Sequence, residues 1–173
     1  SVDRRQAAET PKNGTPEEIV FCEFRDLQTL LQRIIREHFG IDAFVVNGDT
    51  SASAEVENSR QKLIDRFQRA PGFGVIILSP LAVGFGVNIQ AANHVIHFTR
   101  TWNPAKEDQA TDRAYRIGQT RDVTVYYPSV VGNGFKSFDT ILHSLLEWKR
   151  SIAQDMLNAS GELSVADFGE LAL

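Results

Sequence analysis

Five short runs of apolar residues are spaced along the chain, at residues 19–22, 43–46, 75–78, 95–98 and 123–127. Between them lie longer stretches whose apolar residues recur at helical spacing, which predicts helices over residues 27–39, 56–70 and 105–117. The run 75–78 is apolar at every position, as is typical of a strand covered on both faces. This alternation predicts an α/β fold, an open parallel sheet flanked by helices and built from right-handed crossovers.

Local signals indicate where two of the helices begin and end. Asp26 is a plausible cap for the first helix, and Gly40 follows its last apolar position. The second helix is expected to carry Val56 on the same face as Phe67 and to stop before Pro71, since proline cannot continue a helix.

The expected domain organisation is one lobe between two tails. Residues 1–17 combine charges with prolines and glycines and show no periodicity, which indicates a linker or disordered tail. The lobe covers residues 18–158 and ends in a long helix at about 138–157, whose apolar stripe is expected to pack against the core. Residues 159–173 form a C-terminal tail. The apolar stripe of the long helix comprises Ile141, Leu142, Leu145, Ile152 and Met156.

Composition narrows the class of protein. Of the 173 residues, 42% are hydrophobic and 23% are charged, enough for one ordinary core. No stretch reaches the roughly 20 uninterrupted apolar residues that cross a bilayer, and no signal segment opens the chain, so we expect a soluble, intracellular protein. The formal net charge is −4. Any contact with DNA must therefore be local or shared with a more basic partner.

The cysteine and the histidines of the chain give no indication of a metal site or of a catalytic nucleophile. Cys22 is the only cysteine and lies within an apolar run, which favours a buried, inert thiol. His94 and His97 are three positions apart on an expected strand, so their side chains point to opposite faces and cannot easily share a metal ion. We expect no metal site in this lobe.

Ligands of open α/β sheets bind beyond the carboxyl ends of the strands, so the loop after residue 78 is a candidate site. It begins with Ser79 and contains Gly84, Gly86 and Asn88. Two glycines two positions apart allow a tight turn that exposes amide groups to an anion. A purely structural turn explains them equally well.

The segment after residue 98 predicts a second candidate site. Asn103 suits a helix cap and Pro104 the first helical position. On the helix that follows, Gln109, Arg113 and Arg116 would project from one face. Guanidiniums beside a carboxamide suit a polyphosphate, because arginine stays charged and offers planar pairs of donors. A solvated face is the alternative, and spacing does not decide between the two.

Together these segments resemble the second lobe of SWI/SNF-like DNA translocases within superfamily-two helicases, of a bacterial type. Residues 79–104 and the run Gln-Ala-Thr-Asp-Arg-Ala-Tyr-Arg-Ile-Gly-Gln at 109–119 are similar to that branch's fifth and sixth motifs in order and spacing. Residues 19–31 look like its fourth motif, and Gly48 with Arg60 resembles the next segment. The resemblance implies a RecA-like fold.

The resemblance also implies roles for single residues. Arg113 and Arg116 would be arginine fingers that reach the γ-phosphate of ATP, with Gln109 orienting the groups around them. The ATP contacts would include Gly84, Gly86 and Asn88. The DNA-backbone contacts would be Ser79, Arg25, Gly48 and Arg60; for the two arginines in that set, a solvated helix-face charge remains the alternative.

The chain lacks a phosphate-cradling loop of the form G-x-x-x-x-G-K-[ST] and an acidic strand-end motif for Mg²⁺. We therefore expect ATP and Mg²⁺ to be held mainly by an N-terminal RecA-like lobe, and this chain alone to be inactive. The expected partners are that lobe and double-stranded DNA, with no membrane. A cytoplasmic, nucleoid-associated location follows for a bacterial protein.

Two other functions remain open from the sequence. The first is the motor lobe of a helicase or of a DNA-restriction or phage-defence complex, which would share these motifs and differ in its attached domains. The second is a RecA-like interaction module without enzymatic activity, whose arginines hold the acidic surface of a partner.

Overall fold

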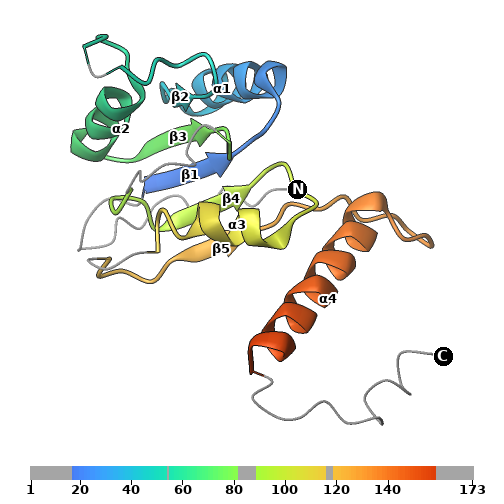
Figure 1. Ribbon diagram of the computed structural model, residues 1–173. Coiled ribbons are helices and arrows are strands. Elements are labelled where there is room, and N and C mark those ends of the chain that lie inside the picture. Colours follow the sequence, from blue (N-terminus) through green and yellow to red (C-terminus); the bar gives the residue numbers. More distant parts are fainter. Residues whose placement is uncertain (1–16, 54, 82–88, 116–118, 159–173) are drawn as a thin grey trace, which may run out of the picture. The chain divides into compact units, whose positions relative to one another are not determined.

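The structure is a computed structural model that describes residues 17–53, 55–81, 89–115 and 119–158 (Figure 1). The chain divides into two compact units, one with residues up to Thr101 and Lys106–Pro128, the other with Trp102–Ala105 and residues from Ser129 onward. The elements are β1 (Glu17–Phe21), α1 (Arg25–Phe39), β2 (Phe44–Val46), α2 (Arg60–Arg69), β3 (Gly74–Leu78), β4 (His94–His97), α3 (Pro104–Thr111), β5 (Thr124–Tyr126) and α4 (Phe138–Asn158).

The five expected strands form one parallel sheet in the order β2-β3-β1-β4-β5. β1 lies in the middle, and its Ile19 is opposite Ile76 of β3 and Val95 of β4. In β3, the four residues from Val75 to Leu78 are all buried, as the unbroken apolar run predicts. The predicted open parallel α/β sheet is therefore confirmed.

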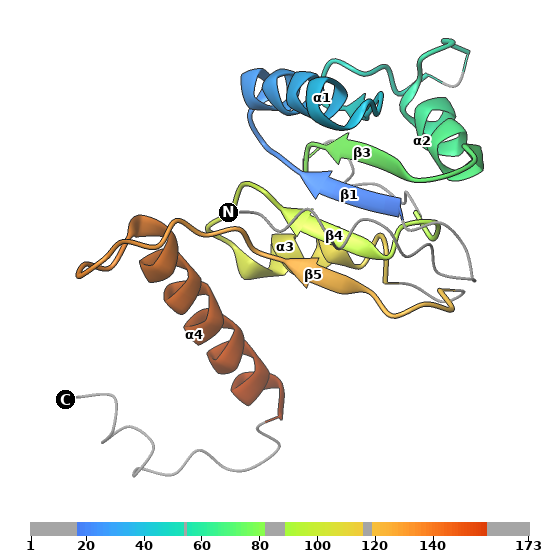
Figure 2. The same ribbon diagram turned by 180° about the vertical axis from the view of Figure 1, so that it is seen from behind.

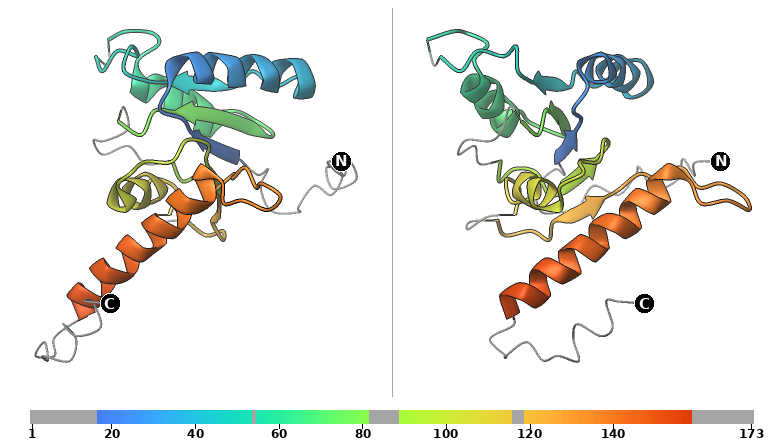
Figure 3. Two further views of the ribbon diagram at one scale, coloured as in Figure 1. Left: turned by 90° about the vertical axis from the view of Figure 1, so that its right-hand side faces the viewer. Right: turned by 45° about the vertical axis from the view of Figure 1, so that its right-hand side comes forward.

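Helices cover both faces of this sheet. On one face, Ile64 and Phe67 of α2 and Ala110 of α3 pack with alternate residues of the strands. On the other face, apolar residues of α1 pack over the remaining strand positions, such as Val20 and Ile77. Figures 1 and 2, seen from opposite sides, place α3 on one side of β4 and β5, and Figure 3 gives two further views of the layers.

The prediction for α1 is correct at the C-terminal end of the helix and wrong at the N-terminal end. Gly40 has a φ of 69°, and its N–H donates to the carbonyl of Arg36, which ends the helix as predicted. The helix begins at Arg25 after Phe24, and no side chain caps it. The prediction of Asp26 as the cap is wrong. Asp26 lies in the first turn instead, where its carboxylate faces the positive end of the helix dipole.

α2 is shorter than predicted. It begins at Arg60, and the hydroxyl of Ser59 accepts a hydrogen bond from the backbone N–H of Lys62 at 3.4 Å. Val56 lies before this cap in a turn, so the prediction that Val56 belongs to the helix is wrong. A serine cap stabilises a helix start by about 1 kcal/mol, which favours the later start over one more turn. The helix stops before Pro71, as predicted.

α3 begins as predicted and ends early. Its cap is Asn103, whose Oδ1 accepts the N–H of Ala105 at 3.0 Å, and Pro104 is the first helical residue. The helix was expected to continue to residue 117 and stops at Thr111. In the turn that follows the helix, the carbonyl of Arg113 accepts the N–H of Ile89 at 2.9 Å, so a tertiary bond holds this turn.

The second unit contains α4, which covers the predicted residues. Of the predicted stripe, Leu142 is buried, Leu145 and Ile152 are half-buried, and Ile141 and Met156 are exposed, so packing involves only part of the predicted face. Leu146, which lies outside that stripe, is also buried. Trp102 is also exposed; its ring meets that of Phe138 edge to face at 5.8 Å. None of the described helices is both long and apolar enough to span a membrane.

Candidate functional site

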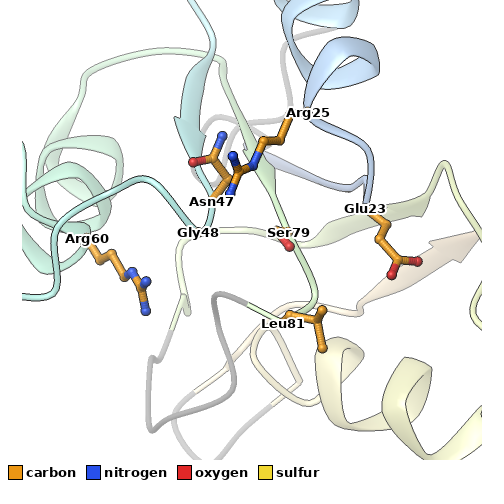
Figure 4. A pocket seen from close by; sticks show the side chains of 7 residues that line it. All are labelled: Glu23, Arg25, Asn47, Gly48, Arg60, Ser79 and Leu81. Carbon is orange, nitrogen blue, oxygen red and sulfur yellow. The ribbon is translucent and has the colours of Figure 1, made fainter.

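A cavity of about 340 Å³ lies at the carboxyl ends of β1, β2 and β3 (Figure 4). Of the four residues assigned to DNA by resemblance, Ser79 and Gly48 come just after β3 and β2, and Arg25 and Arg60 are the first residues of α1 and α2. The structure therefore brings all four to one place, the strand-end cavity, although they span more than 50 positions of the sequence. The lining residues are Glu23, Arg25, Asn47, Gly48, Arg60, Ser79 and Leu81.

Buried polar contacts hold the rim of the strand-end cavity together. Gln28 of α1 is 1% exposed, and its Nε2 donates to the carbonyl of Cys22 at 2.6 Å. Its Oε1 accepts from Nδ2 of Asn47 at 2.9 Å. Gln28 therefore links the segment after β1 to the turn after β2. Buried amides that are satisfied in this way fix local geometry, because a lost partner leaves a desolvated polar group.

The turn after β2 is itself tightly bonded. The N–H of Asp49 donates to Oδ1 of Asn47 at 3.0 Å, and the N–H of Asn47 donates to the hydroxyl of Thr50 at 3.0 Å. Gly48 sits between them. A Cβ at Gly48 would lie 3.2 Å from a terminal nitrogen of Arg25, so glycine lets the guanidinium approach the backbone.

The two arginines of the strand-end cavity are held differently. Arg25 is exposed, and its guanidinium lies 2.9 Å from the carboxylate of Asp49. Arg60 is half-buried, and its Nε donates to the carbonyl of Thr50 at 2.9 Å. In Figure 4 the side chain of Arg25 lies beside Asn47, whereas Arg60 enters from the side of α2. The cavity thus offers guanidinium donors from two elements, a pattern suited to phosphate oxygens.

Gln109 and Arg113, two of the three residues predicted to share a helical face, do not lie on one helix, because α3 ends between them at Thr111. Gln109 is exposed on α3, while Arg113 is half-buried in the turn after the helix, with its N–H donating to the carbonyl of Ala110 at 3.1 Å. Arg116 lies outside the described residues, as do Gly84, Gly86 and Asn88.

A buried ion pair fixes the approach to α3. Arg100 donates to both carboxylate oxygens of Glu107, at 2.7 and 3.0 Å, and the two side chains are 7% and 0% exposed. Burial alone would raise the pKa of Glu107, but the bonds and charge of Arg100 and the N–H of Thr101 hold it below its ordinary value. The Arg100 guanidinium also lies 4.1 Å from the ring centre of Tyr127.

The histidines have structural contacts. His97 is buried between the rings of Phe21 and Tyr127, each 5.2 Å away, and its Nε2 bonds the hydroxyl of Thr111 at 2.8 Å. His94 lies on the other face of β4 and bonds the hydroxyl of Tyr126 at 3.1 Å. The opposite orientation predicted for the two histidines is confirmed. Among the described residues, no group of three or more His, Cys, Asp or Glu could hold a metal ion.

Sequence reasoning missed several residues that position this region. Nε2 of Gln119 donates to the carbonyls of Gln90 and Ala92, at 3.0 and 2.9 Å, and so ties the segment after α3 to the start of β4. Gln28 and Asn47 carry no pattern that singles them out. Gln119 ends the motif run at 109–119, but that run gave it no role of its own.

The chain is similar to a known protein family and to several curated proteins. The model of the helicase conserved C-terminal domain matches residues 8–118. Zorya protein ZorD of Escherichia coli is 62% identical over 150 residues, which cover 87% of this chain and 14% of that protein. The putative ATP-dependent helicase/translocase YwqA of Bacillus subtilis is 38% identical over 153 residues, 88% of this chain and 16% of that protein. The chain thus spans about a seventh of these relatives.

Two solved structures share the fold. The Sulfolobus solfataricus SWI2/SNF2 ATPase core in complex with double-stranded DNA superposes with a TM-score of 0.59 at 35% identity, over 84% of this chain and 28% of that one. The C-terminal part of the Fun30 ATPase domain gives a TM-score of 0.63 at 27% identity, over 88% and 42% of the respective chains. Both neighbours agree with the RecA-like lobe expected from the motifs.

Proposed function

The chain belongs to the helicase conserved C-terminal domain family, in its SNF2-like branch, and from this premise we propose that it is the second motor lobe of an ATP-dependent translocase on double-stranded DNA. The observation that carries the proposal is the strand-end cavity. Four residues assigned to DNA independently of the fold line this one cavity. In the proposal the lobe spans residues 18–158.

The chemistry of the strand-end cavity suits the DNA backbone. Arg25 and Arg60 offer charged planar donors, and Ser79 lines the same cavity with a hydroxyl-bearing side chain. Such groups bind phosphate oxygens and set the position of a protein on a duplex without reading its sequence. A translocase needs this kind of contact, because it must hold every sequence that it passes.

ATP would be bound between this lobe and an N-terminal RecA-like lobe that holds most of the nucleotide and Mg²⁺. Bound there, ATP supplies the γ-phosphate whose transfer drives movement. Arg113 and Arg116 would stabilise the charge that develops on it, with Gln109 orienting neighbouring groups. Two backbone hydrogen bonds, to Ala110 and from Ile89, hold the main chain of Arg113. They support a fixed starting position for the Arg113 side chain.

The first test uses the intact two-lobe protein. Arg113→Ala should lower DNA-stimulated ATP hydrolysis by about 10³-fold or more, the range typical of arginine fingers. The matched control is Arg36→Ala, because Arg36 is an exposed arginine of α1 that pairs with Asp42. Unchanged hydrolysis in a folded Arg113→Ala protein would favour a non-enzymatic interaction module.

A second test uses the 173-residue chain by itself. The proposal expects no ATP hydrolysis by this chain, and DNA-stimulated hydrolysis when the separately expressed first lobe is added. Hydrolysis by the chain alone would contradict the half-motor proposal, because it would require a complete nucleotide site within these residues.

A further inference from the structure

One arginine that lines the strand-end cavity is engaged by an exposed ion pair at the edge of that cavity. The carboxylate of Asp49 lies 2.9 Å from the guanidinium of Arg25, and both side chains are more than 60% exposed. A carboxylate and a phosphate compete for the same planar donors of an arginine. Asp49 therefore occupies part of the group that the proposed function assigns to the DNA backbone.

The position of Asp49 is built into the fold. Its backbone N–H is held by Oδ1 of Asn47, and the amide of Asn47 is bonded in turn to buried Gln28 on α1. Arg25 belongs to the first turn of the same helix. The ion pair thus closes a ring of contacts between α1 and the turn after β2, and this ring keeps the carboxylate beside the guanidinium.

The charge around the cavity is balanced. The lining includes Arg25 and Arg60 but also the carboxylate of Glu23, and Asp49 adds a second carboxylate next to Arg25. A site built only for tight phosphate binding would lack these acidic groups. The formal net charge of −4 for the whole chain agrees with a weak electrostatic hold on DNA.

We propose that Asp49 is a positioning residue and counter-charge that limits how tightly Arg25 holds a DNA phosphate. The pair is exposed, so water and phosphate can exchange with the carboxylate. Arg25 keeps contact with the backbone while Asp49 lowers the affinity of that contact. A motor that advances along DNA has to release each phosphate, and Asp49 favours that release. The inference rests on the proposed function of the cavity.

The experiment measures the affinity of the intact two-lobe protein for a double-stranded DNA probe by fluorescence anisotropy at several salt concentrations. Asp49→Asn should tighten binding about three- to tenfold at low salt. It should also steepen the dependence of log affinity on log salt by up to about 0.9, the value for one more phosphate contact. A merely structural role for Asp49 would not move this slope.

The matched control is Asp42→Asn, which removes a carboxylate from an exposed pair whose arginine, Arg36, lies 3.3 Å away and, unlike Arg25, does not line the cavity. It should leave both affinity and slope unchanged. If the Asp49→Asn protein binds the DNA probe as tightly as the wild type or more weakly, the proposal is overturned. Circular dichroism should show the same melting for both variants and the wild type, since both carboxylates are exposed.

Arg25→Ala separates failure of the inference from failure of the proposed function. If Arg25→Ala leaves DNA affinity unchanged, the cavity is not the DNA site, and the inference falls with that assignment. If Arg25→Ala weakens binding, the gain from Asp49→Asn should shrink by half or more in the Arg25→Ala background. If Asp49→Asn still gives its full gain in DNA affinity in the Arg25→Ala background, the gain is a general effect of net charge. That result would overturn the specific role of Asp49.

Discussion

Two arginine–carboxylate pairs in the sheet unit have the same chemistry and opposite surroundings. Arg25 and Asp49 lie 2.9 Å apart with side chains 62% and 65% exposed, whereas Arg100 and Glu107 lie 2.7 Å apart at 7% and 0%. The exposed pair can exchange its partner for water or a ligand. The buried pair cannot, because neither charge can be left alone in a dry site.

Under the proposed function, this difference separates a DNA-binding surface from a fixed support. The Arg100 pair joins the end of β4 to the first turns of α3 and receives a further N–H from Thr101. It thereby holds the helix that leads to Arg113. The Arg25 pair lies at the edge of the strand-end cavity, where a moving ligand needs a contact that opens at low cost.

The largest expected effect breaks the buried pair. Glu107→Gln keeps the shape of the side chain and removes its charge, which leaves the buried Arg100 guanidinium without its carboxylate. The free energy of unfolding in urea should fall by about 3–5 kcal/mol. The matched variant Asp49→Asn should change it by less than about 1 kcal/mol.

The pH dependence provides a control for this prediction. The pKa of Glu107 is lowered in the folded protein, so its contribution is present above the ordinary value of 4.5 and is lost as pH falls through the lowered pKa. The difference between Glu107→Gln and the wild type should therefore shrink in acid. Equal losses for the exposed and buried pairs at neutral pH would contradict the comparison.

Glu17 sharpens the comparison, because it is a buried carboxylate without a guanidinium bond. Its Oε2 has no hydrogen-bond partner among the described residues, and burial raises its pKa to about 7 against the opposing charge of Arg121. The stability from a raised pKa is complete below 4.5 and is lost as pH rises through about 7.

Glu17→Gln removes this titration. The free energy of unfolding of the wild type should fall as Glu17 ionises, while that of the variant should not. The difference between variant and wild type should therefore move by about 2 kcal/mol in favour of the variant from pH 5.5 to pH 8.5. Urea unfolding of the 173-residue chain at the two pH values measures the gain. A difference that stays constant with pH would show that Glu17 does not titrate in this range.

The smallest effect concerns the support of the exposed pair. Gln28→Leu removes the amide that bonds the Cys22 carbonyl and Asn47, at a cost of about 1–2 kcal/mol for polar groups left without a partner. Thermal unfolding measures the loss. The control is Gln61→Leu, because Gln61 is exposed on α2 and its amide donates to the carboxylate of Asp65. Similar losses in the two variants would contradict the role of buried Gln28.

Hydrophobic pattern made the fold predictable in most respects. The five apolar runs became the five strands, and Gly40 and Asn103 mark helix ends as expected. The errors concern helix ends at Asp26, Val56 and Thr111. At two of these, a contact decides the boundary: the Ser59 cap for α2 and the bond from Ile89 to Arg113 for α3.

The candidate site was predictable in its residue types and only partly in its arrangement. The resemblance assigned Arg25, Gly48, Arg60 and Ser79 to DNA, and all four line one cavity. It gave no reason to single out Asp49 or Gln28. The shared helical face expected for Gln109 and Arg113 was wrong, since α3 ends between them.

The sequence by itself determined the order of strands and helices along the chain and the family to which the lobe belongs. Both depend on local patterns, because apolar periodicity and motif spacing can be read within short windows. Tertiary structure alone decided which charges are exposed and which are buried. The two arginine pairs look alike in the sequence, and they differ because strand order places one beside a cavity and the other beneath a helix, where desolvation changes the energy of a charge.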